Sequence, residues 1–313
     1  MFSSSGTPTL TLPFLLPILA RRKALQGQAL PSGSQAKWGT MHAMTDHRFL
    51  PDTSRLSILT GSVLLAFALT RVLNLPQAKI SLPLPMFVMV FSIDLRTIIA
   101  VLAALLTAVG VDWLLRTHPS LEKGKSREHW LLPMLTVLVL GIALNTLPQT
   151  GIWWLGFTLV AVLLVLVLLA EYVAVDPSDA RYPLATVVLT ALAFAIFLIL
   201  AAALRAANAR LFLLAPALFF GAGLPALRTL HLRLTERWEP AWALGIGLAA
   251  VQLGAALHYW PLSPLDFGLA LLAPVYALTV LSVSLADGVP FSRAAAEPAV
   301  MLVILWGLLI WFH

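Results

Sequence analysis

Acidic side chains near the ends of apolar segments are the residues of this sequence best placed to do chemistry. Carboxylates at helical spacing can bind a divalent metal ion that in turn holds a diphosphate. The candidates with their basic neighbours are Asp112, Arg116, Glu171, Asp176, Asp179 and Arg181. If these side chains converge at one pocket, the sequence encodes a membrane enzyme that acts on a lipid or polyprenyl substrate.

A structural interpretation competes at each of these positions. Asp112 and Arg116 are four residues apart, the spacing of an ion pair on one helix. The run Asp176-Pro177-Ser178-Asp179 has the residue types of a helix N-terminus, with a capping side chain, a proline and an early acid. We prefer these interpretations because no second Asp-rich motif occurs. Glu171 is then an acid at the level of the lipid headgroups that pairs with Arg181.

A second polar group lies near the end of a later apolar segment. His258 and Asp266 flank a tight turn, and a His–Asp pair can relay a proton or orient a ligand. Gln252 and Tyr259 are seven residues apart and share a helix face, and Tyr276 lies further along the chain. The alternative is an interfacial aromatic cluster in which Ser263 and Asp266 cap the next helix.

Two arginines and a set of small residues complete the candidates. Arg205 and Arg210 flank a short loop. They either bind phosphate headgroups or snorkel, with the aliphatic part of the side chain in lipid and the guanidinium in water. Close helix packing is predicted for a face of small side chains. These are Gly245, Gly247, Ala249, Ala250, Gly254 and Ala255.

Several chemistries find no support in the sequence. We find no nucleotide-binding glycine motif, no zinc-protease motif and no nucleophile elbow. Because cysteine is absent, disulfides, thiolate nucleophiles and cysteine-bound metals are excluded. We therefore predict no catalytic residue, no metal and no cofactor. We ascribe the net charge of +6 to the flanks of membrane segments, so it does not imply nucleic acid as a partner.

The elements that must position these residues are apolar helices. Of the 313 residues 60% are hydrophobic and only 11% are charged, whereas soluble domains carry about 25% charged residues. We predict an all-α polytopic bundle with about nine spans of roughly 20 residues. They are Leu56–Leu75, Thr97–Leu115, Leu131–Leu147, Ile152–Ala170, Leu184–Leu204, Leu211–Leu230, Ala241–Leu257, Leu265–Leu285 and Glu297–Phe312.

Charge predicts how the spans are oriented. Lys and Arg are concentrated in the loops at 116–130 and 230–240, which are therefore expected in the cytoplasm. Nine spans then give a cytoplasmic N-terminus and an external C-terminus. The apolar segment 80–93 holds Pro83 and Pro85, and we expect it not to cross but to form a re-entrant or interfacial segment.

The first fifty residues differ from the rest. Their apolar run precedes Arg21, Arg22 and Lys23, the reverse of a secretory signal, and a Gly/Ser/Gln-rich stretch follows. We predict a disordered tail or a mis-assigned extension over 1–50, with Met41 or Met44 as the native start, and a single transmembrane domain over 51–313.

Two stretches resemble signatures of an uncharacterised bacterial multi-pass membrane family. They are Val111-Asp112-Trp113-Leu114-Leu115-Arg116-Thr117-His118-Pro119 and Ala170-Glu171-Tyr172-Val173-Ala174-Val175-Asp176-Pro177. The resemblance implies the bacterial cytoplasmic membrane, and it implies no activity.

Three functions stay open. The leading one is a non-catalytic accessory or scaffold subunit, whose partners are the lipid bilayer and other membrane subunits. The second is a permease or lipid-handling transporter, with a mid-membrane polar cavity that includes Asn145, Gln252 and Tyr276. The third is the membrane enzyme described above.

Overall fold

A computed structural model describes residues 51–72, 77–84, 87–116, 118, 128–148, 150–234 and 237–312. Its helices are α2 (Thr53–Val72), α3 (Leu95–Leu115), α4 (Leu131–Thr146), α5 (Gly151–Val173), α6 (Tyr182–Ala206), α7 (Leu211–Arg233), α8 (Pro240–His258), α9 (Pro264–Ala286), α10 (Phe291–Ala294) and α11 (Ala296–Phe312). The strands are β1 (Gln77–Leu84) and β2 (Phe87–Asp94). The predictions for residues 1–50 lie outside the described residues.

The fold class predicted from the sequence is confirmed. In the described part of the chain, eight helical segments are long and apolar enough to cross a membrane, with α10 and α11 together forming the last. α4 is apolar but shorter, with 16 residues that extend about 24 Å at 1.5 Å per residue. α4 packs against α3, α5, α6 and α7, so protein surrounds much of it. The protein is thus a polytopic helical membrane protein.

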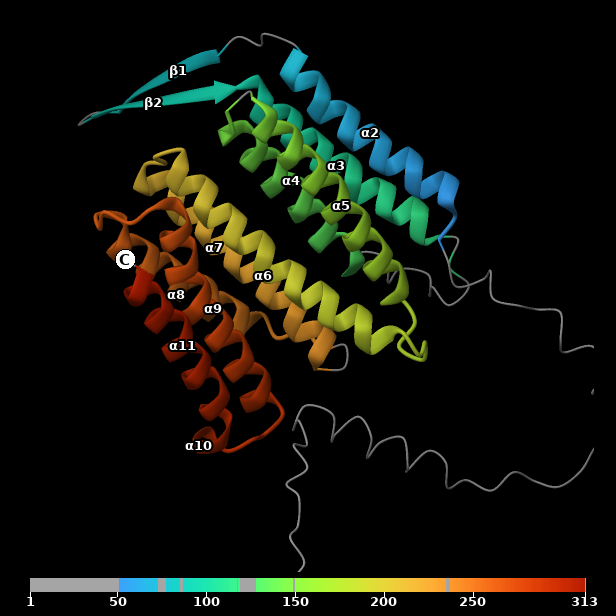
Figure 1. The fold of residues 1–313 in the computed structure, drawn as a ribbon, viewed down its shortest axis with the longest axis vertical. Helices are drawn as coiled ribbons and strands as arrows, with labels where there is room; N and C mark the ends of the chain where they lie inside the picture. Colours follow the sequence, from blue (N-terminus) through green and yellow to red (C-terminus); the bar gives the residue numbers. More distant parts are fainter. Residues whose placement is uncertain are drawn as a thin grey trace, which may run out of the picture. The chain divides into compact units, whose positions relative to one another are not determined.

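Figure 1 shows that successive helices of the bundle run in alternating directions. At one end, Arg55 of α2 donates from Nη1 to the carbonyl oxygen of Trp113 in α3 at 2.8 Å. At the other, Arg71 of α2 lies 4.7 Å from the ring centre of Trp153 in α5. We call the first the Glu171 end and the second the Arg205 end, after residues described below. The sequence predicts that the Glu171 end faces the cytoplasm.

The segment 80–93 is a β-hairpin. β1 and β2 pair antiparallel, from Gln77 opposite Asp94 to Leu84 opposite Phe87. Pro83 is tolerated because each strand of a two-stranded sheet is an edge strand. Since α2 and α3 pack antiparallel, the chain leaves and re-enters the bundle at the Arg205 end. The hairpin therefore adds no helical span.

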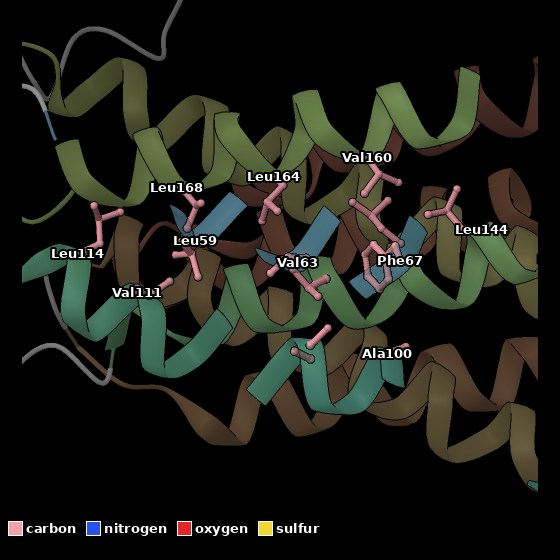
Figure 2. Packing of buried hydrophobic residues seen from close by; sticks show 14 of the residues in the cluster. Leu59, Val63, Phe67, Ala100, Val111, Leu114, Leu144, Val160, Leu164 and Leu168 are labelled. Carbon is pink, nitrogen blue, oxygen red and sulfur yellow. The ribbon is translucent and has the colours of Figure 1, made fainter. Parts of the chain in front are cut away.

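Overlapping layers of aliphatic side chains form the core. Figure 2 shows the first layer, where Leu59, Val63 and Phe67 of α2 pack with side chains from α3, α4 and α5. Further layers join α4 to α5 and α6, and α6 to α7, α8 and α9.

Part of the predicted small-residue face packs against a neighbouring helix. Gly247, Ala250 and Gly254 of α8 are buried against α7. A Cβ at Gly247 would lie 2.8 Å from the carbonyl oxygen of Phe219. Gly245 has nothing within 4 Å of such an atom, so it belongs to the outward face of α8.

The outer surface is strongly apolar. α11 packs chiefly on α9 and leaves most of its side chains exposed, including Val303 at 68% and Ile310 at 74%. Among the described contacts, the Trp306 indole nitrogen of α11 donates to the carbonyl oxygen of Ala270 in α9 at 3.2 Å. Large exposed aliphatic side chains are the expected surface of a protein solvated by lipid.

The two predicted helix caps have different outcomes. Ser263 caps α9 as predicted, since its hydroxyl oxygen accepts a hydrogen bond from the backbone nitrogen of Asp266 at 3.3 Å. The predicted cap at Asp176 is wrong, because α6 begins only at Tyr182. Asp176 and Asp179 instead accept hydrogen bonds from the backbone nitrogens two residues later, which shape successive turns.

Candidate functional site

Three helices bring ionisable side chains together inside the Glu171 end. Glu171 lies in the last turns of α5, and Arg228 lies five residues before the end of α7. His129 belongs to a short turn that leads into α4. Glu171 and Arg228 lie in the last two turns of their helices and His129 lies just before α4, so the side chains converge at one end of the bundle.

The three side chains form a closed cluster of hydrogen bonds. Arg228 Nη2 donates to Glu171 Oε2 at 2.6 Å, and Arg228 Nε donates to Oε1 at 3.3 Å. His129 Nδ1 lies 2.7 Å from the same Oε2. The exposed fractions of the side chains are 1% for Glu171, 2% for Arg228 and 9% for His129. A buried carboxylate needs such compensation, because an isolated charge in a low-dielectric interior is very costly.

The proton on His129 is the ambiguous element of the cluster. Its Nδ1 lies close to Glu171 Oε2, an acceptor, and 3.0 Å from Arg228 Nη2, a donor. A protonated Nδ1 donates to the carboxylate, and an unprotonated Nδ1 accepts from the guanidinium. Proton occupancy at this atom therefore decides which neighbour His129 binds.

A second pair of an acid and a histidine, Glu128 with His231, lies next in sequence to His129 and Arg228 of the cluster. His231 Nε2 is 2.9 Å from Glu128 Oε2, and the imidazole stacks on Trp238 with ring centres 4.1 Å apart. Within the described residues, the buried Nδ1 of His231 has no hydrogen-bond partner. Glu128 precedes His129, and His231 follows Arg228 by three residues, so the two pairs tie together the same two segments.

His118 lies in the loop after α3 at this end. Its ring packs edge-on against Tyr172, with centres 4.8 Å apart. Burial lowers the pKa of His118, and the nearby charge of His129 adds to that shift, whereas Asp176 and Asp179 oppose it.

The acids predicted from the sequence are engaged by different partners. Asp112 Oδ2 pairs with Arg116 Nη2 at 2.7 Å, which confirms the helical ion pair. Asp179 accepts from the backbone nitrogen of Arg181. The expected pairing of Glu171 with Arg181 is wrong, because Glu171 points into the bundle and binds Arg228 and His129. The described contacts therefore do not gather the predicted acids into one pocket. Nor do the described residues hold any group of three or more His, Asp or Glu side chains arranged to bind a metal.

The polar residues predicted near the Arg205 end are also dispersed. Gln252 of α8 and Tyr259, which follows the last residue of that helix, are both exposed. The described hydrogen bonds of Asp266 go to Ser263. His258 packs edge-on against Tyr259, and Tyr276 packs against Phe194 of α6.

Arg205 has a role that the sequence did not reveal. Its guanidinium donates to the carbonyl oxygens of His258, Trp260 and Leu262 at 2.8, 2.7 and 3.3 Å. These carbonyl groups belong to the last residue of α8 and to the residues just after it. A cation at that position interacts favourably with the negative end of the helix dipole. The carbonyls lie more than fifty residues from Arg205 in sequence, so no local pattern indicated them.

Sequence reasoning also missed Arg228, His129 and His231. Arg228 lies just before the basic loop at 230–240, and neither histidine belongs to a motif. The only signal was indirect: Glu171 ends an apolar span, and an acid there needs a partner of opposite charge.

Comparison with known proteins identifies a family. A family model described as "Protein of unknown function (DUF5656)" matches residues 75–312, which include the whole ionic cluster. No curated protein and no solved structure matches the chain. The chain belongs to the DUF5656 family.

Proposed function

We propose that this integral membrane protein is a non-catalytic component of a membrane complex in the bacterial cytoplasmic membrane. The observation that carries the proposal is the closed Glu171–Arg228–His129 cluster. Its charges compensate each other, and its side chains are almost fully shielded. Such a cluster holds α4, α5 and α7 in one arrangement and leaves little of itself for a substrate.

The outward face of α8 supports the subunit role. Gln252 is exposed twelve residues into a helix of 19, and no hydrogen bond of its side chain is described. An amide in lipid gains stability from a partner on another helix. Gly245 lies on the same outward face, and a glycine there lets a second helix approach.

Native mass spectrometry of the tagged protein, extracted from its own membrane, tests this function. We expect a stoichiometric protein partner that is lost in Gln252→Leu and kept in Thr158→Val. Thr158 is a suitable control because it is also exposed, but its hydroxyl bonds to its own helix at Trp154. A protein that is recovered without any protein partner would contradict the proposal.

A proton-coupled permease is the second candidate, and the two-sided contact of His129 Nδ1 favours it. Histidine and acid chains inside membrane proteins serve as proton relays. Charge displacement after a pH jump, recorded on a solid-supported membrane, separates the candidates. A transient current in the wild type that is absent in His129→Gln favours the permease. The absence of a current in both proteins favours the non-catalytic component.

A further inference from the structure

A small pocket opens at the Arg205 end, remote from the ionic cluster. It has a volume of about 160 Å³ and is lined by Leu204, Arg205, Asn208, Ala209, Leu214 and His258. One water molecule needs only about 10–15 Å³ of such space, so the pocket has room for a group of several heavy atoms. Its walls come from the end of α6, the loop that follows it, the first turn of α7 and the end of α8.

The pocket carries a positive charge. Arg205 makes three hydrogen bonds to carbonyl oxygens, and a guanidinium has five N–H groups, which leaves two. No carboxylate among the described residues lies within ion-pair distance of it. An anion would therefore gain charge-assisted hydrogen bonds without displacing an acid.

Two further groups at the pocket can donate hydrogen bonds. His258 lines the pocket, and its Nδ1 atom has no hydrogen-bond partner in the described structure. Because solvent does not reach that atom, the imidazole must turn for Nδ1 to donate to an anion in the pocket. A buried imidazole nitrogen without a partner is unfavourable, and a bound anion would supply one. Asn208 adds a side-chain amide from the loop, where its φ of 49° places it in the left-handed region.

The start of α7 lies beside these groups. The residue before it, Arg210, makes no side-chain capping hydrogen bond, and the chain enters the helix directly from the pocket-lining loop. The positive end of a helix dipole adds to the attraction of an anion.

From this geometry we propose that the pocket binds a phosphate group through Arg205, His258 and Asn208. The group belongs either to an anionic phospholipid headgroup or to free phosphate, and the chemistry of recognition is the same. The site is independent of the function proposed above, since it shares no residue with the ionic cluster or with Gln252.

Native mass spectrometry and thermal unfolding of the delipidated full-length protein test the site. The probes are dioleoyl phosphatidylglycerol, dioleoylglycerol and inorganic phosphate. We expect phosphatidylglycerol, inorganic phosphate or both to bind, and dioleoylglycerol not to bind. Stabilisation by phosphatidylglycerol alone identifies the source as lipid, and stabilisation by inorganic phosphate identifies free phosphate. If neither phosphate compound binds, the proposal is overturned.

Variants locate the binding. Arg205→Gln also removes the tie to α8, so Asn208→Gly and His258→Phe serve as the main tests. Glycine keeps the left-handed backbone and removes only the amide side chain. Each should weaken binding at least about tenfold, the factor for one good hydrogen bond to an ion. Arg116→Gln removes one positive charge from an exposed side chain at the other end, so it should bind as the wild type does. Equal loss in Arg116→Gln, or no loss in both pocket variants, overturns the proposal.

Discussion

Arg228 and Glu171 meet 57 residues apart in sequence, with 2.6 Å between Nη2 and Oε2 and almost no exposed surface on either side chain. Removing one partner of such a pair leaves an uncompensated buried charge. We expect Glu171→Gln to lower the free energy of unfolding by about 3–5 kcal/mol. Denaturant titration in detergent measures it. Asp112→Asn, which breaks a pair whose arginine is 72% exposed, should cost about 0–1 kcal/mol. Equal losses would contradict the buried-pair account.

The double variant Glu171→Gln/Arg228→Gln should be more stable than the two single losses predict together. Both formal charges are then gone, and the amides can bond to each other and to His129. Side chains in one network typically show coupling energies of about 0.5–3 kcal/mol. A double-mutant cycle on the same titration gives the coupling. Strict additivity would show that the two side chains do not act as a pair.

Close packing of α8 on α7 rests on Gly247. Gly247→Ala should destabilise the bundle, because the new methyl group would lie 2.8 Å from the Phe219 carbonyl oxygen, which cannot rotate away. Overpacking of this kind costs about 1–3 kcal/mol. Gly245→Ala is the matched control, since nothing lies within 4 Å of the added atom. It should be neutral or slightly stabilising, because alanine favours the helix.

Stability should depend on pH through His118. Its pKa in the folded protein lies below the ordinary value of 6.5, mainly because of burial. The unfolded chain therefore binds more protons, so stability is full above pH 6.5 and is lost as the pH falls from 6.5 toward the lowered pKa. Melting temperatures across this window should fall less steeply in His118→Gln. A slope unchanged by the substitution would assign the pH dependence to another group.

The predicted orientation can be tested because the chain has no cysteine. Thr150 and Ala180 are exposed and lie before and after α5, at its opposite ends. We expect a membrane-impermeant maleimide to label Thr150→Cys in intact cells and Ala180→Cys only after permeabilisation. The reverse pattern would invert the topology.

Sequence reasoning recovers this fold because lipid imposes a simple rule on spans. Apolar segments of about 20 residues predict the helices, and the capping types at Ser263 and Asp266 predict the start of α9. The hairpin was not predicted, because the composition of a short apolar stretch that contains prolines fits either strands or a short distorted helix. In the described pairing, the backbone groups of β1 and β2 bond to each other across the two strands.

The candidate site was predicted only in part, for a related reason. Glu171 and Asp112 were identified by their position in apolar segments, which is a local property. The partner of Asp112 lies four residues away and was found, whereas the partners of Glu171 lie 42 and 57 residues away. Which helices place their ends together is a property of the packed bundle, and no spacing in the sequence carries it.

The sparse packing of α11 bears on the order in which the protein is built. A ribosome delivers the chain from its N-terminus, so α11 reaches the membrane after the other described helices. The helices that hold Glu171, His129 and Arg228 all precede it, and its main contacts are with α9 and α10. The bundle and its ionic cluster can therefore be complete before α11 arrives. Docking of α11 then becomes a separate, late step of biogenesis, during which the surface of α9 is open to other membrane helices.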